Sequence, residues 1–111
     1  MRFDIQTKSE ANQYEHWTAR YKRKKAQQEA FHILWRSFRP KVTLPAIFTF
    51  TRFSARTMDS DNLAGAFKHV RDQLARELKI DDGSELLQFR YAQERTKTHE
   101  NYFELTIEEI K

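Results

Sequence analysis

The chain has 111 residues, and its 39% hydrophobic and 14% aromatic content suffices for one folded core, which excludes wholesale disorder. It has no cysteine and no long apolar run, which excludes a disulfide scaffold, a thiolate metal site and a membrane partner, so we expect a cytoplasmic protein. The net charge of +4 is divided unevenly: residues 1–57 hold 12 Lys/Arg and 4 Asp/Glu, and residues 58–111 hold 8 and 12. This division indicates one surface that meets phosphates and another that holds a cation, the alternative being ordinary solvated charge.

The first 40 residues predict a short strand followed by one long helix. Residues 2–7 alternate between polar and apolar side chains, as a half-buried strand does. Residues 10–38 contain neither glycine nor proline, and Pro40 ends the helix that they predict. Its apolar positions follow three-and-four spacing, with a polar interruption over residues 22–29 where the helix projects or bends. These positions are Tyr14, Trp17, Tyr21, Phe31, Trp35 and Phe38.

The rest of the chain predicts three strands and a second helix. Residues 42–53 alternate as a strand, in which Pro45 indicates an edge position or a bulge. Residues 62–79 predict a helix, and the turn 81–84 leads to strands around residues 87–91 and 103–107, joined through 96–101 as an antiparallel hairpin. The second helix has the apolar stripe Leu63, Phe67, Val70, Leu74 and Leu78. The expected fold class is α+β, one domain over residues 1–111 in the order β-α-β-α-β-β, with two helices on a small mixed sheet.

Two pairs of aspartates stand at the ends of the second predicted helix. Asp59 and Asp61 lie two residues apart before it, so in an extended chain their carboxylates point the same way and favour a hard cation such as Mg²⁺. Asp81 and Asp82 lie beyond its other end and supply a third ligand if the turn folds back. The alternatives are that Asp59 and Asp61 cap the helix and that Asp81 and Asp82 form a plain turn.

The order of these residues resembles a known family of nucleases. The matching residues are Asp59-x-Asp61-Asn62-Leu63, then Lys68, Asp72 and Leu74 on the helix, then Asp81-Asp82. This set is similar to the signature of the RusA-type Holliday-junction endodeoxyribonucleases, the crossover junction resolvases, and the first 40 residues resemble phage-type members more loosely. The resemblance covers residues 56–95. It implies a RusA-like fold, a homodimer, Mg²⁺ or Mn²⁺ as the cofactor, no small-molecule cofactor, and four-way DNA junctions as the substrate.

By this resemblance Asp59, Asp61 and Asp82 bind the metal, with Asp81 in reserve, and Lys68 completes the catalytic set. The sequence departs from the family at two positions: Gly65 stands where the family has its catalytic lysine, and Met58 where it often has a basic residue. Lys68 lies on the same helical face as position 65, within about 60°, and Arg56 compensates for Met58. The alternative for Lys68 is a solvated side chain paired with Asp61 or Asp72.

The densest basic segment lies in the first half and is the expected DNA-binding surface. Arginine and lysine neutralise phosphates and release their counterions. The predicted DNA-binding residues are Arg20, Lys22, Arg23, Lys24, Lys25 and Arg56. Trp17 and Tyr21 interleave with them and either stack on unpaired bases or form core or dimer contacts. The alternative for the whole segment is a solvated polar stretch.

The leading hypothesis is therefore a divalent-metal-dependent endonuclease that resolves Holliday junctions or related branched DNA by phosphodiester hydrolysis. One alternative is a module of the same fold that binds branched nucleic acid without catalysis. The other is an interaction protein whose long helix, 10–38, pairs with a protein partner.

Overall fold

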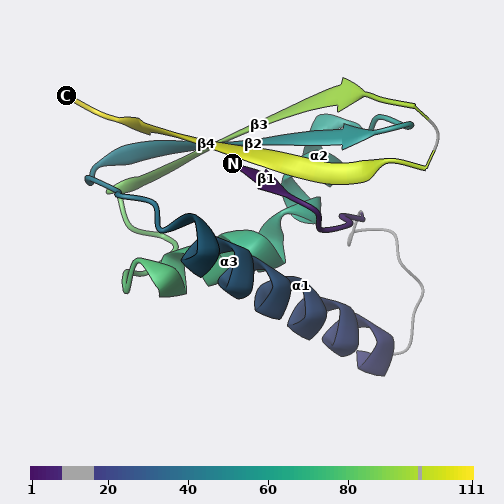
Figure 1. Ribbon diagram of the computed structural model, residues 1–111, viewed down its shortest axis with the longest axis horizontal. Helices are drawn as coiled ribbons and strands as arrows, with labels where there is room; N and C mark the ends of the chain where they lie inside the picture. The colour runs from purple at the N-terminus through teal and green to yellow at the C-terminus, as the bar shows by residue number, and fades with distance from the viewer. Residues whose placement is uncertain (9–16, 98) are drawn as a thin grey trace.

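A nine-residue strand with alternating buried side chains forms the centre of the fold, which is seen in a computed structural model that describes residues 1–8, 17–97 and 99–111. Figure 1 shows two layers, a sheet and the long helices beneath one of its faces. Within the described residues there are four strands in the sheet and three helices. The elements are β1 (Arg2–Phe3), α1 (Trp17–Phe38), β2 (Ala46–Ser54), α2 (Ser60–Ala66), α3 (Lys68–Glu77), β3 (Leu87–Arg95) and β4 (Asn101–Glu109). The α+β class is confirmed, with three helices in place of the two expected.

The sheet is mixed and its strands stand in the order β1-β4-β2-β3. β2 pairs in parallel with β3 and antiparallel with β4, and β1 pairs antiparallel with β4. A parallel pair needs a crossover between its strands, which α2 and α3 provide. Consequently α2 starts near the carboxyl ends of β2 and β3, and the chain returns to the amino end of β3.

The predicted hairpin between the last two strands is wrong, because β2 lies between β3 and β4 and pairs with both. The short spacing of residues 96–101 suggested direct pairing. β2 has a buried side chain at every second position from Ala46 to Ser54, so it takes the central place and separates the other two strands. The edge position inferred from Pro45 is also wrong. Pro45 lies one residue before β2, where its missing N–H removes no ladder hydrogen bond.

The helices differ from the prediction in their boundaries. α1 is described from Trp17 onward, and the part of the prediction on residues 10–16 lies outside the described residues. The helix expected over 62–79 is divided at Phe67, whose φ of −98° and ψ of 4° end α2 and start α3. Phe67 is fully buried and its ring stacks on Phe50, with centroids 5.0 Å apart. The residue at which one helix ends and the next begins is thus held in the core by its side chain.

The core fills the space between the sheet and the helices, and stacked phenylalanines dominate it. Phe3 stacks on Phe31 of α1 and on Phe103 of β4, with ring centroids 4.8 and 5.1 Å apart. These contacts join the edge strand, the long helix and the inner face of the sheet. The predicted first strand, residues 2–7, shortens to β1 because the chain turns where Ile5 N–H donates to the Phe3 carbonyl. Among the helices of the described residues, none combines the length and the apolar character needed to cross a membrane.

Candidate functional site

The loop that carries Asp59 lies at the carboxyl ends of β2 and β3, where the inner face of the sheet changes from aromatic to polar. Arg52 occupies an inward position of β2 and is only 6% exposed. Its Nη1 donates to the Arg56 carbonyl at 2.7 Å, and its Nε donates to Thr7 Oγ1 at 3.0 Å. Burial lowers the pKa of Arg52 from its usual value. The arginine thus fixes the loop at the backbone of Arg56.

Gln93 of β3 holds the same loop at a second point. The Met58 N–H donates to Gln93 Oε1 at 2.9 Å, and Gln93 Nε2 donates to the Met58 carbonyl at 2.6 Å. The sequence prediction missed Gln93. Its signal was a polar residue continuing the inward-facing series of Leu87, Phe89 and Tyr91, because an amide at such a position needs a polar partner. Gln93 therefore sets the position of the residue directly before Asp59.

Asp59 and Asp61 both lie exposed at the start of α2. Asp59 is the N-cap: its Oδ1 accepts a hydrogen bond from Asn62 N–H at 3.0 Å, so the capping role is present. Asp61 lies in the first turn of α2, where the helix dipole favours a negative charge. The prediction that an extended chain aligns the two carboxylates is therefore wrong, because the helix already begins at Ser60. The cap occupies one oxygen of Asp59, which leaves the second oxygen and the Asp61 carboxylate facing solvent.

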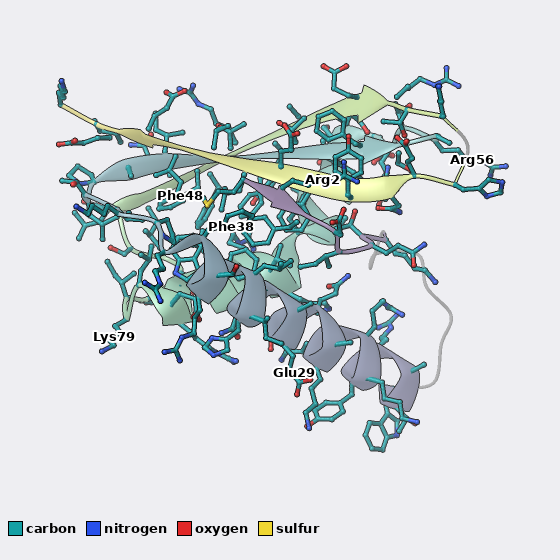
Figure 2. All side chains as sticks on the ribbon, in the orientation of Figure 1. Arg2, Glu29, Phe38, Phe48, Arg56 and Lys79 are labelled. Atoms are coloured by element: carbon teal, nitrogen blue, oxygen red, sulfur yellow. The ribbon has the colours of Figure 1, made fainter. Side chains whose placement is uncertain are left out.

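Asp81 and Asp82 lie at the opposite end of the crossover. The parallel register runs from Ala46↔Leu87 to Ser54↔Arg95. Eight steps of about 3.3 Å separate its two ends by about 26 Å. Asp59 comes after the Ser54↔Arg95 end of this strand pair, whereas Asp82 comes before the Ala46↔Leu87 end. Arg56 lies close to Asp59 along the chain and Lys79 lies close to Asp82, and Figure 2 shows Arg56 and Lys79 at opposite ends of the molecule.

The turn after α3 does fold back, but only as far as the last turns of that helix. Lys79 takes a left-handed φ of 56°, and Ile80 N–H donates to the Ala75 carbonyl at 3.0 Å. Asp81 and Asp82 consequently line a hollow together with Asp72 and Arg76 of α3. The arginine offsets part of this negative charge. The fold-back that the sequence prediction needed for a shared site does not extend to Asp61.

A divalent cation fits the Asp59–Asp61 pair better than the full predicted set. Over residues 1–8, 17–97 and 99–111 the structure brings together no group of three or more His, Cys, Asp or Glu side chains suited to a metal. Mg²⁺, however, is commonly held by one or two carboxylates together with substrate phosphates and water. Asp59 and Asp61 are exposed and two residues apart at the start of α2, so they remain the candidate ligands, and Asp82 of the same chain does not join them.

The two positions considered for a catalytic lysine lie on either side of Phe67. Lys68 is exposed at the first residue of α3, and in the described part of the chain it forms no ion pair with Asp61 or Asp72. Gly65 is the second-last residue of α2, and a Cβ at this position would meet no atom within 4 Å. A longer side chain therefore has room at position 65.

The predicted DNA-binding cations are distributed around α1 and do not form a single row. Arg23 lines a hollow beside residues 4–8, whereas Lys24 and Lys25 line another hollow beside Arg76 of α3. Arg20 and Lys22 are exposed, and Arg56 is exposed on the loop before Asp59, away from α1 and beside the ends of the strands. Phosphate contacts on one duplex would therefore involve only part of this set.

Comparisons of the chain with protein-family models, with curated proteins and with solved structures gave no match. The geometry of the loop before α2 is thus the basis for assigning a function.

Proposed function

We propose that the protein is a RusA-type, Mg²⁺-dependent endonuclease that cuts branched DNA such as a four-way junction. The observation that carries the proposal is the placement of Asp59 and Asp61, two exposed carboxylates at the N-cap and in the first turn of α2, directly after a loop whose backbone is held by Arg52 and Gln93. Sites fixed on rigid elements keep catalytic geometry, and the carboxyl ends of parallel strands are a common position for ligand sites.

Asp59 and Asp61 would hold the cation, with Mn²⁺ as an alternative to Mg²⁺. Bound there, the cation would polarise a phosphoryl oxygen and make a bound water acidic enough to attack phosphorus. The protein itself supplies the fixed carboxylates, and Arg56 supplies an exposed guanidinium on the same loop for a neighbouring phosphate. Lys68 is the nearest lysine along the chain for offsetting charge on the phosphate. It lies beyond the break at Phe67, so the shared helical face that the sequence predicted for positions 65 and 68 is not present.

We propose that the active form is a homodimer, because a four-way junction presents two equivalent strands to two related sites. A dimer also provides a source for a third carboxylate. Asp81 and Asp82 of one chain lie at the far end of the crossover from that chain's own Asp61. If Asp82 contributes to the site, it does so from the second copy.

Incubation of the protein with a labelled four-way junction and Mg²⁺ tests the proposal. Asp61→Asn should abolish cleavage while junction binding is retained, because the substitution removes a metal ligand and leaves the Asp59 cap in place. Glu108→Gln is the matched control, since Glu108 is an exposed acid on β4 outside the site. Cleavage by Asp61→Asn at the wild-type rate would refute the assignment.

A non-catalytic module that binds branched nucleic acid is the second candidate. It is favoured by the absence of a lysine at position 65 and by the lack of a three-carboxylate group within the residues that the structure describes. The same assay separates the two candidates. Junction binding by the wild-type dimer without cleavage in either Mg²⁺ or Mn²⁺ would establish the binding module.

A further inference from the structure

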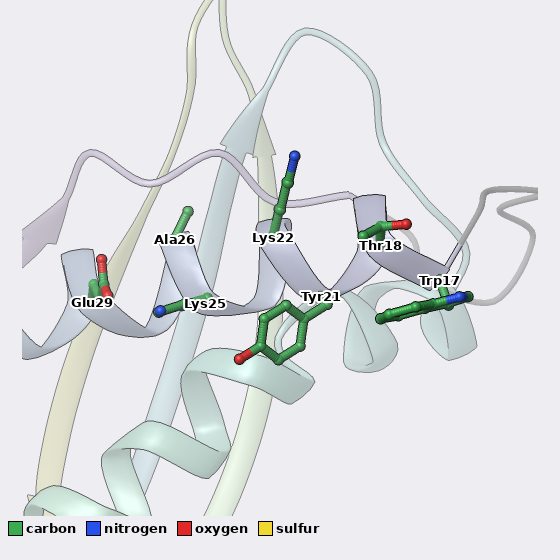
Figure 3. Close-up of a pocket in the computed structure, with 7 residues that line it drawn as sticks. All are labelled: Trp17, Thr18, Tyr21, Lys22, Lys25, Ala26 and Glu29. Carbon is green, nitrogen blue, oxygen red and sulfur yellow. The ribbon is translucent and has the colours of Figure 1, made fainter.

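Two large aromatic side chains project from the first turns of α1 and do not join the core. Trp17 is 70% exposed and Tyr21 is 57% exposed, so of the alternatives that the sequence left for them, base stacking, core contacts or dimer contacts, the core alternative is wrong. They lie four residues apart, which places them one above the other on one side of the helix. Figure 3 shows both rings on the same side of α1, with Lys25 continuing their row.

Cationic side chains surround these rings. Within the described residues, Trp17 and Tyr21 line a hollow of about 490 Å³ together with Lys22, Lys25 and one acid, Glu29. A second hollow, of about 220 Å³, is lined by Tyr21, Lys24, Lys25 and Arg76. Tyr21 and Lys25 belong to both hollows, so the two are adjacent.

The second hollow leads on to the acidic end of α3. Arg76 lines it and also lines the hollow that contains Asp81 and Asp82. The Nη1 of Arg76 donates to Gln28 Oε1 of α1 at 3.4 Å, which joins the two helices at this point. A track of exposed rings and cations thus runs from the start of α1 across to α3.

This combination fits one chemical class of partner. Exposed aromatic rings offer flat surfaces on which bases stack, and lysines and arginines between them neutralise the backbone phosphates. The bases of a duplex are already stacked inside it, so only unpaired nucleotides can use the rings. Among the described residues that line the two hollows, Lys22, Lys24, Lys25 and Arg76 outnumber the acid Glu29, and this excess of positive charge favours a polyanion over the neutral apolar surface of a second copy.

We propose that the α1 aromatic face, formed by Trp17, Tyr21, Lys24, Lys25 and Arg76, binds an unpaired strand of DNA. Bases stack on Trp17 and Tyr21, and phosphates lie against the lysines and Arg76. The proposal rests on the proposed function, since it names the part of a branched substrate that this face grips. It concerns binding alone, so it is tested without cleavage.

The experiment measures binding of the full chain, in EDTA and in the Asp61→Asn background, to a labelled oligodeoxythymidine of about 12 nucleotides. A duplex of the same length is the second probe. Trp17→Ala and Tyr21→Ala should each weaken single-strand binding about five- to hundred-fold and leave duplex binding unchanged. Ile33→Ala is the matched control, because Ile33 is 66% exposed on the same helix and lies outside both hollows.

Tryptophan emission gives a direct readout of stacking. Trp35 is only 8% exposed, so a bound base should quench Trp17 and leave Trp35 emission in place, and Trp17→Phe should remove the quenching. Equal losses of single-strand and duplex affinity in Trp17→Ala would overturn the proposal. So would unchanged single-strand affinity, or a change in sedimentation showing that the face joins two copies of the chain. Because no cleavage is measured, a failure of the nuclease proposal would leave this result independent.

Discussion

Replacing Gly65 by alanine should stabilise the fold by about 0.5–1 kcal/mol, because glycine loses more backbone freedom in a helix than alanine does. The native backbone accepts the change. Gly65 lies inside α2, no glycine of the described residues has a positive φ, and a Cβ at this position meets no atom within 4 Å. For a chain of 111 residues with an unfolding entropy of about 2.1 cal/mol/K per residue, the gain corresponds to a rise of about 2–4 °C in Tm.

Thermal unfolding followed by circular dichroism, with urea unfolding as a second measurement, checks this value. An unchanged or lower Tm for Gly65→Ala would refute the reasoning, since it would mean that position 65 needs the freedom of glycine. Gly65→Lys shares the backbone gain and adds an ammonium group. Comparing junction cleavage by the two variants therefore isolates the charge. Under the proposed function Gly65→Lys should cut faster than Gly65→Ala, and equal rates would mean that a lysine here is not limiting.

Three further changes test the core, the loop and the dimer. Phe67→Ala should cost about 3–5 kcal/mol in urea unfolding because it empties a fully buried position, and a loss below about 1 kcal/mol would contradict the packing. Gln93→Leu should cost about 1–3 kcal/mol, since it leaves the Met58 N–H and carbonyl without their partners, and should slow cleavage more than Gln88→Leu, an exposed neighbour on β3. Mixing Asp61→Asn chains with Asp82→Asn chains should restore about one quarter of wild-type nicking, if each site takes Asp82 from the second copy. Half of the dimers are then mixed, and each mixed dimer has one of its two sites intact. No nicking by the mixture would exclude a shared site.

Periodicity predicted which faces are buried better than it predicted which strands are partners. The alternation in β2 and the stripe through Leu63, Val70 and Leu74 correspond to side chains that the structure buries. The pairing of β3 with β4 was wrong because pairing depends on which strand buries the most surface, and that competition is not local. The break at Phe67 was also beyond the pattern, since the stripe continues across it.

The sequence indicated where Asp59 lies, and it did not indicate which residues hold the loop before it. Asp59 lies at the start of a helix, as its position before an apolar stripe indicated. The loop contacts of Arg52 and Gln93 were missed because they are made to backbone atoms, whose positions the sequence does not give. Trp17 and Tyr21 continue the spacing of Phe31 and Trp35, yet they are exposed where the latter are buried, and spacing alone does not distinguish the two ends of α1.

Arg52 and Gln93, which anchor the loop before α2, determine which substitutions this loop tolerates. Both bind main-chain atoms, the carbonyl of Arg56 and the N–H and carbonyl of Met58, so neither anchor depends on the side chain at these positions. The exposed position 56 can therefore vary in charge and size while Asp59 stays in register. Position 58 is more constrained, because the half-buried Met58 side chain also packs against the core.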